Sequence, residues 1–134
     1  MKRLIFTLVL SFAAVLVQAQ VKYQLSSHIL DISTGMPAPN VRVQLSKLNE
    51  QSKTWVLVDE KVTNENGRIQ DFLDASKPNK GIHKLCFLVE GYFKSKNVES
   101  FYPFVDVVFK IKDEKHYHVP ITLSAYGYST YRGN

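Results

Sequence analysis

The sequence predicts an all-β fold, an antiparallel β-sandwich with one short helix. The first observation is that apolar and polar residues alternate with a period of two in several short runs. The second is that glycine, proline and asparagine separate these runs at close spacing. The third is size, because 134 residues with 45% hydrophobic and 22% charged residues suffice for one globular domain but not for two. About seven strands are expected.

The first residues have the pattern of a secretory signal. Met1-Lys2-Arg3 is positive, residues 4–17 are apolar and uncharged, and Val17-Gln18-Ala19 has small residues where a signal peptidase needs them. The apolar segment is too short for a membrane anchor, which needs ~20 residues to cross a hydrocarbon layer of ~30 Å. We therefore expect a signal peptide at residues 1–19, export to the periplasm or the extracellular space, and a soluble domain at residues 20–134.

Two strands follow at the start of this domain. In residues 21–30, Leu25 and Ile29 share one face and His28 lies on the opposite face. A connection rich in glycine and proline leads to a second strand at residues 41–46, where valine and leucine alternate with polar residues.

The central part contains a third strand and a tight turn. The third strand is expected at residues 55–59, after a polar turn at residues 49–53. Asn66-Gly67 is a dipeptide typical of tight hairpin turns because it tolerates positive φ. Arg68 follows directly and is expected where the hairpin joins its next strand.

The C-terminal half continues with strands and one helix. Residues 82–89 form a nearly continuous apolar run, which indicates a buried strand, and His83 within it is expected to be a core or edge histidine. Residues 91–100 lack clean alternation, so the short helix is expected there. Strand patterns return at residues 104–111 and 116–123.

The charge balance and the cysteine count exclude some classes of function. A net charge of +5 and a pI near 9.3 would suit a nucleic-acid-binding protein. Removal of Lys2 and Arg3 with the signal would lower the net charge to +3, and the other bases are interspersed with acids, so we expect no nucleic-acid partner. Cys86 is the sole cysteine, which excludes an internal disulfide and a zinc site built on paired cysteines. We expect Cys86 to be a small buried hydrophobe.

The histidines and arginines are the residues where chemistry is expected. His116 and His118 are two apart on a predicted strand and project from one face. With His28 they could surround a catalytic zinc ion, although no carboxylate is placed to support such a site. The alternative needs no metal, because an imidazole can take a proton from water while Arg68 or Arg132 holds an anion. Each residue alone also fits a polar side chain on a solvated face.

Three tyrosines near the C-terminus are unusual for a chain end. Tyr126, Tyr128 and Tyr131 lie within the last nine residues, and chain ends are usually polar and frayed. We therefore expect these rings to be buried. Either a last strand packs them, or the terminal segment lines a pocket and offers Tyr131 and Arg132 to a ligand.

Three segments together carry a family resemblance. They are Ser27-His28-Ile29-Leu30-Asp31 with Thr34-Gly35 and Pro37-Ala38, Thr63-Asn64-Glu65-Asn66-Gly67-Arg68, and His116-Tyr117-His118-Val119-Pro120-Ile121 followed by Tyr126-Gly127-Tyr128-Ser129-Thr130-Tyr131-Arg132-Gly133. On these segments the chain resembles the 5-hydroxyisourate hydrolases, the transthyretin-like (prealbumin-like) enzymes of urate breakdown, from about Tyr23 onward. The family usually ends in Tyr-Arg-Gly-Ser, whereas this chain ends in Asn134 and so has an amide in place of the terminal hydroxyl.

The resemblance implies a hydrolase of purine degradation that converts 5-hydroxyisourate to 2-oxo-4-hydroxy-4-carboxy-5-ureidoimidazoline. Water would attack a ring carbonyl and the adjacent C–N bond would open, without a cofactor or a metal ion. The implied catalytic residues are His28, His118 and Arg68, and the implied substrate-binding residues are His28, Arg68, Tyr131, Arg132 and Gly133.

The resemblance also implies a homotetramer, a dimer of dimers with active sites at the dimer–dimer interface. No membrane partner is implied. Two alternatives remain at this point. One is a secreted transthyretin-like protein that binds a small ligand without turnover, and the other is a metallohydrolase that uses His28, His116 and His118.

Overall fold

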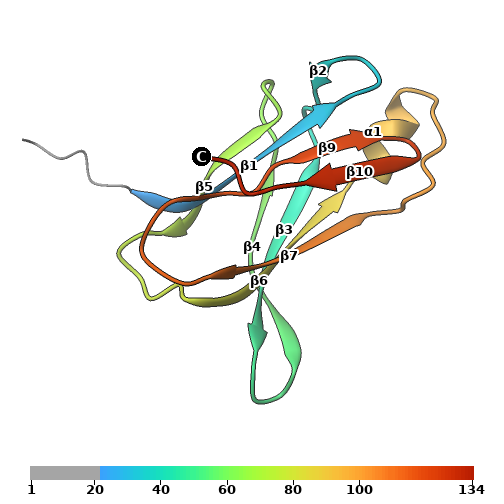
Figure 1. Cartoon of the computed structure of the whole chain (residues 1–134). Helices are drawn as coiled ribbons and strands as arrows, with labels where there is room; N and C mark the ends of the chain where they lie inside the picture. Colours follow the sequence, from blue (N-terminus) through green and yellow to red (C-terminus); the bar gives the residue numbers. More distant parts are fainter. Residues whose placement is uncertain (1–21) are drawn as a thin grey trace, which may run out of the picture.

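The computed structural model describes residues 22–134, which form two β-sheets packed face to face (Figure 1). The predicted signal peptide at residues 1–19 lies outside the described residues. Within the described part, the first sheet has six strands, β1 (Tyr23–Asp31), β2 (Met36–Pro37), β5 (Arg68–Asp74), β8 (Tyr117–His118), β9 (Ile121–Ser124) and β10 (Gly127–Thr130). Strands β10, β9, β1 and β2 are neighbours in that order, and β5 and β8 also pair with β1.

The second sheet has four strands in the described residues, ordered β4-β3-β6-β7. They are β3 (Arg42–Asn49), β4 (Thr54–Val62), β6 (Gly81–Leu88) and β7 (Val105–Ile111). The helix α1 (Glu90–Ser95) connects β6 to β7 and begins one residue before the predicted stretch. The predicted β-sandwich with one short helix is thus confirmed. None of the helical segments within residues 22–134 has the length and apolar character needed to cross a membrane.

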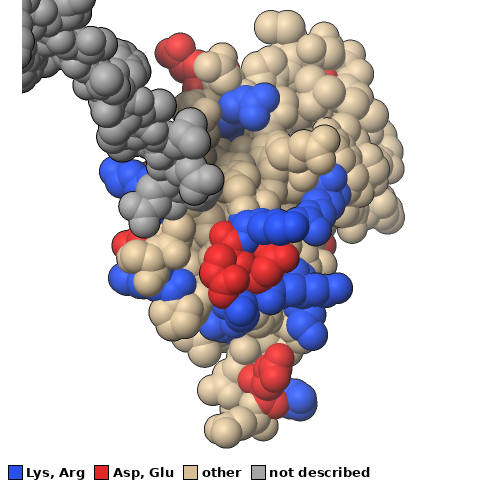
Figure 2. Space-filling view, turned by 60° about the vertical axis from the view of Figure 1, so that its left-hand side comes forward, with Lys and Arg blue, Asp and Glu red and all other residues tan. Residues whose placement is uncertain are grey.

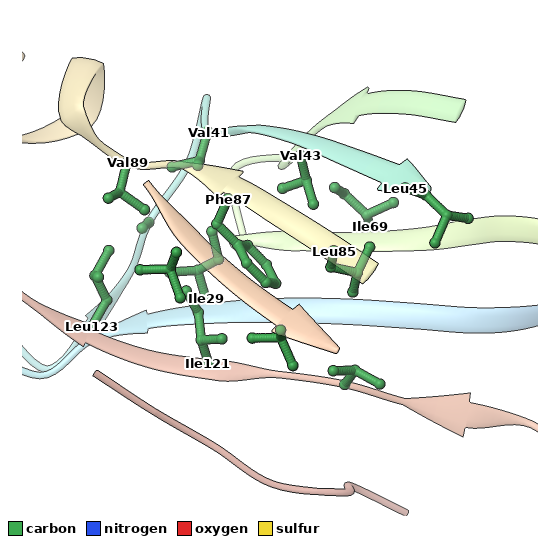
Figure 3. Packing of buried hydrophobic residues seen from close by; sticks show 14 of the residues in the cluster. Ile29, Val41, Val43, Leu45, Ile69, Leu85, Phe87, Val89, Ile121 and Leu123 are labelled. Carbon is green, nitrogen blue, oxygen red and sulfur yellow. The ribbon is translucent and has the colours of Figure 1, made fainter. Parts of the chain in front are cut away.

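A hydrophobic core fills the space between the sheets (Figure 3). Its centre is made of side chains that are at most 1% exposed, namely Ile29, Val43, Leu85, Phe87, Ile121 and Leu123. Burying each of these side chains stabilises the fold by about 1.5–3 kcal/mol. Because β1 directs Leu25 and Ile29 into this core, its other face is left for polar residues, as the alternation predicts.

The strand predicted at residues 116–123 is interrupted. It forms β8 and β9 with Pro120 between them, because proline has no N–H to donate to a ladder. Both strands pair with β1 in parallel, whereas all other pairings in the described residues are antiparallel. These two parallel pairings are the exception within the predicted antiparallel sandwich, and they arise because the chain enters β8 after leaving β7 of the other sheet.

Two groups of apolar and aromatic side chains at sheet edges are more exposed than expected. Strand β4 is an edge of its sheet, so Trp55, Val56 and Leu57 are exposed. The expected burial of the C-terminal tyrosines is wrong for the single chain, since Tyr126 is 74% exposed and Tyr131 is 60% exposed. Both lie at or beyond the ends of β10, which has a neighbour on one side only.

Strand β6 is buried on one face rather than on both. His83 is 1% exposed, which confirms a core histidine. Cys86 is half-buried because it points to the outer face of the sheet. Burial, with help from Asp106, raises the pKa of the Cys86 thiol to about 12, so the thiol stays protonated at neutral pH.

Candidate active site

Strand β1 is the centre of the candidate site because β5 flanks it on one side and β8 on the other. In the antiparallel register with β5, His28 lies opposite Arg68. In the parallel register with β8, Ser26 lies opposite His118. Ser26 and His28 are two residues apart and share the face of β1 that points away from the core. Three predicted residues that are distant in sequence, His28, Arg68 and His118, therefore meet on one sheet face.

The turn before β5 fixes the start of that strand. Gly67 has a φ of +68°, which confirms the predicted tight turn, and a Cβ at this position would lie 2.7 Å from the carbonyl oxygen of Ile29. Only glycine fits both conditions. The side chain of Asn64 accepts a hydrogen bond from the backbone N–H of Arg68 at 2.9 Å. This turn holds Arg68 beside β1.

The C-terminal segment closes the other side of the site. The backbone N–H of Gly133 donates to the carbonyl oxygen of His118 at 2.8 Å. A Cβ at Gly133 would overlap the imidazole ring of His118, so glycine is required for this close approach. The chain end thereby lies beside β1 and β5, on the face of the sheet that carries Ser26 and Arg68 (Figure 1).

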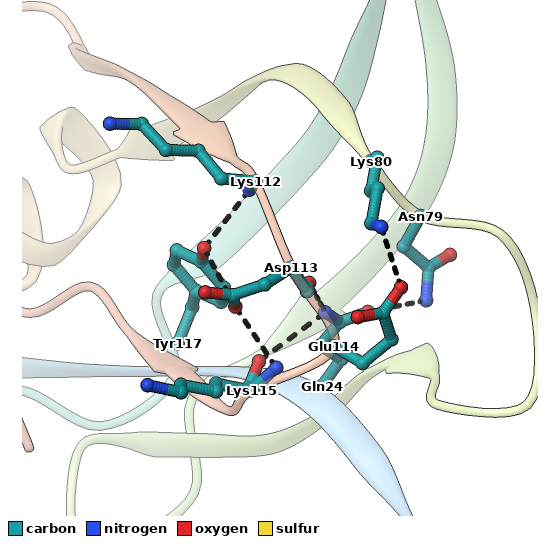
Figure 4. A network of polar contacts seen from close by, with 8 residues as sticks. All are labelled: Gln24, Asn79, Lys80, Lys112, Asp113, Glu114, Lys115 and Tyr117. Atoms are coloured by element: carbon teal, nitrogen blue, oxygen red, sulfur yellow. Dashed lines mark hydrogen bonds and ion pairs between the residues drawn. The ribbon is translucent and has the colours of Figure 1, made fainter.

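A polar network anchors the loop that leads into β8 (Figure 4). Gln24 of β1 donates to the carbonyl oxygens of Asp113 at 2.6 Å and Lys115 at 3.3 Å. The hydroxyl of Tyr117 donates to Asp113 at 3.1 Å and accepts from the backbone N–H of Lys112 at 3.0 Å. These bonds fix the position of His118, the residue that follows Tyr117, relative to β1.

A polar hollow of about 280 Å³ lies on this face. It is lined by Ser26, Ser27, Arg68, Gln70, His116, His118 and Asn134. His28 lies beside the hollow rather than in its lining, and it is close enough for its charge to act on His118. Sequence reasoning missed Ser26 and Gln70 as site residues. Each is two residues from a predicted one, Ser26 before His28 and Gln70 after Arg68, so the period of two was the available signal.

Both histidines of the site are held toward their neutral form. Burial lowers the pKa of His118 below 6.5, and the positive charge of Arg68 lowers it further, followed by smaller effects of His28 and His116. Burial and then Arg68 also lower the pKa of His28. At neutral pH each imidazole therefore has a free nitrogen lone pair and can accept a proton.

Tyr131 and Arg132 lie elsewhere in the single chain. They line a second hollow of about 310 Å³, together with Phe109 and Tyr117. The guanidinium carbon of Arg132 lies 4.6 Å from the centre of the Tyr117 ring, a cation–π contact. Tyr117 points to the opposite face of β8 from His118, so these residues do not meet His118 in one hollow. Their predicted contact with substrate stays a prediction.

The three-histidine metal site is not assembled in the described residues, where no group of three or more histidine, cysteine or acidic side chains is placed to hold a metal ion. Hydrogen bonds occupy both ring nitrogens of His116, since Nδ1 lies 3.0 Å from the carbonyl oxygen of Tyr23 and Nε2 lies 2.8 Å from Oγ of Ser26. A metal ion at His116 would have to displace one of these bonds.

Charged side chains of both signs are mixed on the face shown in Figure 2. Lysine and arginine side chains lie around aspartate and glutamate there rather than in one continuous basic area. Lys61 pairs with Asp71 at 3.1 Å and with Asp59 at 3.7 Å, and Arg42 pairs with Glu60 at 3.5 Å. This arrangement does not resemble the basic stripe of a nucleic-acid interface.

The chain is similar to known proteins in sequence and in fold. The HIUase/Transthyretin family profile matches residues 25–133. A probable 5-hydroxyisourate hydrolase of Caenorhabditis elegans is 42% identical over 98% of this chain and 96% of its own length. The structure of Klebsiella pneumoniae 5-hydroxyisourate hydrolase is 38% identical, with a TM-score of 0.70 over 82% of this chain and 98% of that one.

A second structure, sea bream transthyretin in complex with thyroxine, has a TM-score of 0.77 over 82% of this chain and 94% of that one. At 24% identity it shows the fold alone. The family profile covers most of the chain, and the nematode relative is similar over nearly all of it. The chain belongs to the HIUase/transthyretin family.

Proposed function

We propose that the protein is a hydrolase that converts 5-hydroxyisourate to 2-oxo-4-hydroxy-4-carboxy-5-ureidoimidazoline. The observation that carries the proposal is the meeting of His28, Arg68 and His118 on one sheet face, beside a polar hollow. The names of the Caenorhabditis and Klebsiella relatives support the same substrate. The reaction needs water as the nucleophile, a base to take its proton and a cation to hold the charge that develops.

The imidazole of His118 is the group that we assign as the general base. It lines the hollow, and its lowered pKa keeps it neutral at pH 7. It takes a proton from water as the oxygen attacks a ring carbonyl of the substrate. His28, next to Arg68 on the same face, orients this water or the substrate. General-base help of this kind accelerates a reaction by ~10²–10⁴-fold.

The guanidinium of Arg68 supplies the positive charge. It lines the hollow with His118, and its charge acts on both site histidines. An arginine stays protonated at any physiological pH, so it can hold an anionic heterocycle and the oxyanion that forms on the attacked carbonyl. The adjacent C–N bond then opens, and the proton held by His118 goes to the leaving nitrogen.

Besides their predicted contact with substrate, we assign to Gly133 and Arg132 the role of holding the terminal segment against β8. Gly133 contacts the ring of His118, and Arg132 stacks on Tyr117. In this arrangement Arg132 would support catalysis from the far face of β8. Tyr131, which is exposed, would reach substrate only where a second copy of the chain brings its site near.

We further propose the homotetramer. Strands β7 and β10 stand at the ends of their sheets in the described residues, with unpaired backbone groups that a second copy can pair. The hollow lined by Tyr131 and Phe109 also has other residues of β7 and Thr130 of β10 in its lining. Exposed apolar side chains on these two strands, Val108 on β7 and Tyr128 on β10, favour an interface. Sedimentation velocity is expected to give four times the chain mass, and a monomer at micromolar concentration would contradict the proposal.

Export is the third part of the proposal. It is supported by the positive start of the chain and the uncharged apolar residues 4–17. Mass spectrometry of protein made in a secreting host is expected to find a new N-terminus near Gln20. A recovered protein that begins at Met1 and stays inside the cell would contradict export.

The activity is tested by making 5-hydroxyisourate in place with urate oxidase and following its decay by absorbance. The protein is expected to accelerate the decay over the spontaneous rate, and EDTA is expected to leave that acceleration unchanged. A decay rate equal to the blank would favour a binding protein without turnover. Loss of activity with EDTA and its return with zinc would favour the metallohydrolase.

A further inference from the structure

Ser26 bridges two imidazole rings on the catalytic face. Its Oγ lies 2.8 Å from Nδ1 of His118 and 2.8 Å from Nε2 of His116. The two histidines are two residues apart and turn toward the same side of β8, so one hydroxyl on β1 reaches both. None of the roles assigned so far to the site uses Ser26 or His116.

The outer end of this chain of hydrogen bonds has a fixed direction. Nδ1 of His116 lies 3.0 Å from the backbone carbonyl oxygen of Tyr23. A carbonyl oxygen can only accept a hydrogen bond, so Nδ1 of His116 must carry a proton. In neutral His116 the other nitrogen, Nε2, then has no proton and can only accept. The partner within reach of Nε2 is the hydroxyl of Ser26.

The order of donors and acceptors fixed at His116 continues through Ser26 to His118. A hydroxyl has one proton to donate, and Ser26 gives it to His116. The oxygen of Ser26 is then free to accept a hydrogen bond, and Nδ1 of His118, at 2.8 Å, is the group that donates it. A neutral imidazole carries one N–H, so Nε2 of His118 is left without a proton.

We propose that Ser26 and His116 are positioning residues that hold His118 in the tautomer whose Nε2 is free to take a proton from water. The inference rests on the proposed hydrolase activity, since it explains how His118 becomes a competent base. When His118 takes the proton at Nε2, its Nδ1–H stays bonded to Ser26, so the ring does not have to turn during the reaction. The second hydrogen bond of a catalytic histidine commonly sets its tautomer in this way.

The terminal segment fits the same arrangement. Gly133 lies close to the Cδ2 edge of the His118 ring, the edge next to Nε2, since a Cβ at this position would overlap the ring there. Asn134, the residue that follows, lines the hollow that His118 also lines. Ser26 therefore contacts the Nδ1 side of the ring, and the terminal segment lies beside the edge that carries Nε2.

The test uses two substitutions of Ser26 and one matched control. Ser26→Ala removes the bridge and is expected to lower kcat by about 10- to 100-fold, the usual cost of losing a supporting hydrogen bond, with little change in KM. Ser26→Thr keeps the hydroxyl and is expected to restore most of the rate. Ser52→Ala removes an exposed hydroxyl in the β3–β4 turn, which bonds only Thr54 at 2.6 Å, and is expected to leave kcat unchanged.

A second measurement reports the tautomer without turnover. Long-range ¹H–¹⁵N correlation spectra of histidine-labelled protein distinguish protonated from unprotonated ring nitrogens. In the wild-type protein we expect the His118 proton on Nδ1, and in the Ser26→Ala protein we expect it to shift toward Nε2. A His116→Phe protein is expected to show a smaller shift in the same direction, because Ser26 is then free to donate to His118.

The outcomes separate this inference from the proposed function. A wild-type protein that shows no turnover while His118 carries its proton on Nδ1 would refute the activity and leave the tautomer assignment standing. A proton on Nε2 of His118 in the wild-type protein would overturn the inference, even with full activity. A Ser26→Ala protein with the wild-type kcat would also overturn it. If Ser26→Ala does not fold, the wild-type spectrum alone decides.

Discussion

His118 and His83 lie in two regions that both depress the pKa of a histidine, yet only one region is suited to catalysis. Burial is the main cause of the lowered pKa at each residue. The side chain of His83 in β6 is buried, and its Nδ1 lies 3.2 Å from the carbonyl oxygen of Gly81. Its ring stacks on Phe109, with 5.9 Å between the ring centres. His118 instead faces a polar hollow that it shares with Arg68.

The difference teaches what a lowered pKa means in this protein. At His83 it reports that a core histidine stays neutral because no water reaches it. At His118 it accompanies an open polar hollow that also holds the guanidinium of Arg68, and these are the conditions for accepting a proton from water. In this protein a lowered pKa therefore indicates a possible general base only where a substrate can reach the imidazole ring.

The largest expected effect is that of His118→Asn. It removes the proposed base, so kcat/KM is expected to fall by ~10²–10⁴-fold while the fold is retained. The decay of 5-hydroxyisourate after urate oxidase treatment of urate measures this change. A variant with the wild-type rate would show that His118 is not the base and that, like His83, it is not needed for turnover.

Arg68→Gln tests the cation that lines the hollow with His118. Loss of a donor to the oxyanion is expected to lower kcat by ~10²–10³-fold. Because a positive neighbour disfavours imidazolium, the wild-type rate should decline as pH falls through a value below 6.5, and Arg68→Gln should move that decline to higher pH. A pH profile of kcat/KM checks the direction of the shift.

Arg68→Lys is the control for this pair of effects. It keeps the positive charge and loses the planar fork, so the acid decline should stay near its wild-type position while kcat falls. If both Arg68 variants moved the acid decline equally, the charge of Arg68 would not be what acts on His118.

Gly133→Ala tests whether the position of the terminal segment matters for His118, which has no counterpart at His83. The added Cβ would overlap the His118 ring and displace either the ring or the chain end. A misplacement of about 1 Å at a reacting group can cost ~10²-fold in rate, so we expect a loss of about 10- to 100-fold in kcat. Gly91→Ala, where a Cβ meets nothing within 4 Å, is the matched control and should keep the full rate.

The smallest expected effect on rate is that of His83→Phe. The ring that stacks on Phe109 is retained but the hydrogen bond of Nδ1 with the carbonyl oxygen of Gly81 is lost, so kcat should not change while stability should fall by about 1–3 kcal/mol. The folded-state pKa of His83 lies below its unfolded value near 6.5, so the unfolded chain binds the extra proton as pH falls. Wild-type stability is therefore lost progressively below pH 6.5.

The His83→Phe protein should lose stability less steeply over this range, because one of the three histidines with a lowered pKa is gone. Denaturant unfolding at a series of pH values between 7 and 5 measures the slope. An equal slope in both proteins would mean that His83 does not contribute to acid sensitivity.

Much of the fold follows from local patterns. The two-residue alternation in β1 places Ile29 in the core and His28 outside it, and the Asn66-Gly67 dipeptide marks the turn that positions Arg68. The interruption at Pro120 also has a local cause. The exposure of β4 does not, because an edge strand and a central strand can have the same apolar sequence.

The site was harder to predict from the sequence than the fold was. Its histidines and Arg68 follow from residue type and from family resemblance, but the part played by Ser26 depends on β1 pairing with β8, some 90 positions further along the chain. No local pattern specifies which strands become neighbours. The placement of Arg132 against Tyr117 likewise depends on the path of the terminal segment.

The most direct measurement of the central claim compares the His118→Asn and His83→Phe proteins in one assay of 5-hydroxyisourate decay at pH 7. We predict that the His83→Phe protein accelerates the decay as the wild-type protein does, and that the His118→Asn protein leaves it close to the spontaneous rate. Equal rates for the two variants, whether both fast or both slow, would contradict the assignment of His118 as the base.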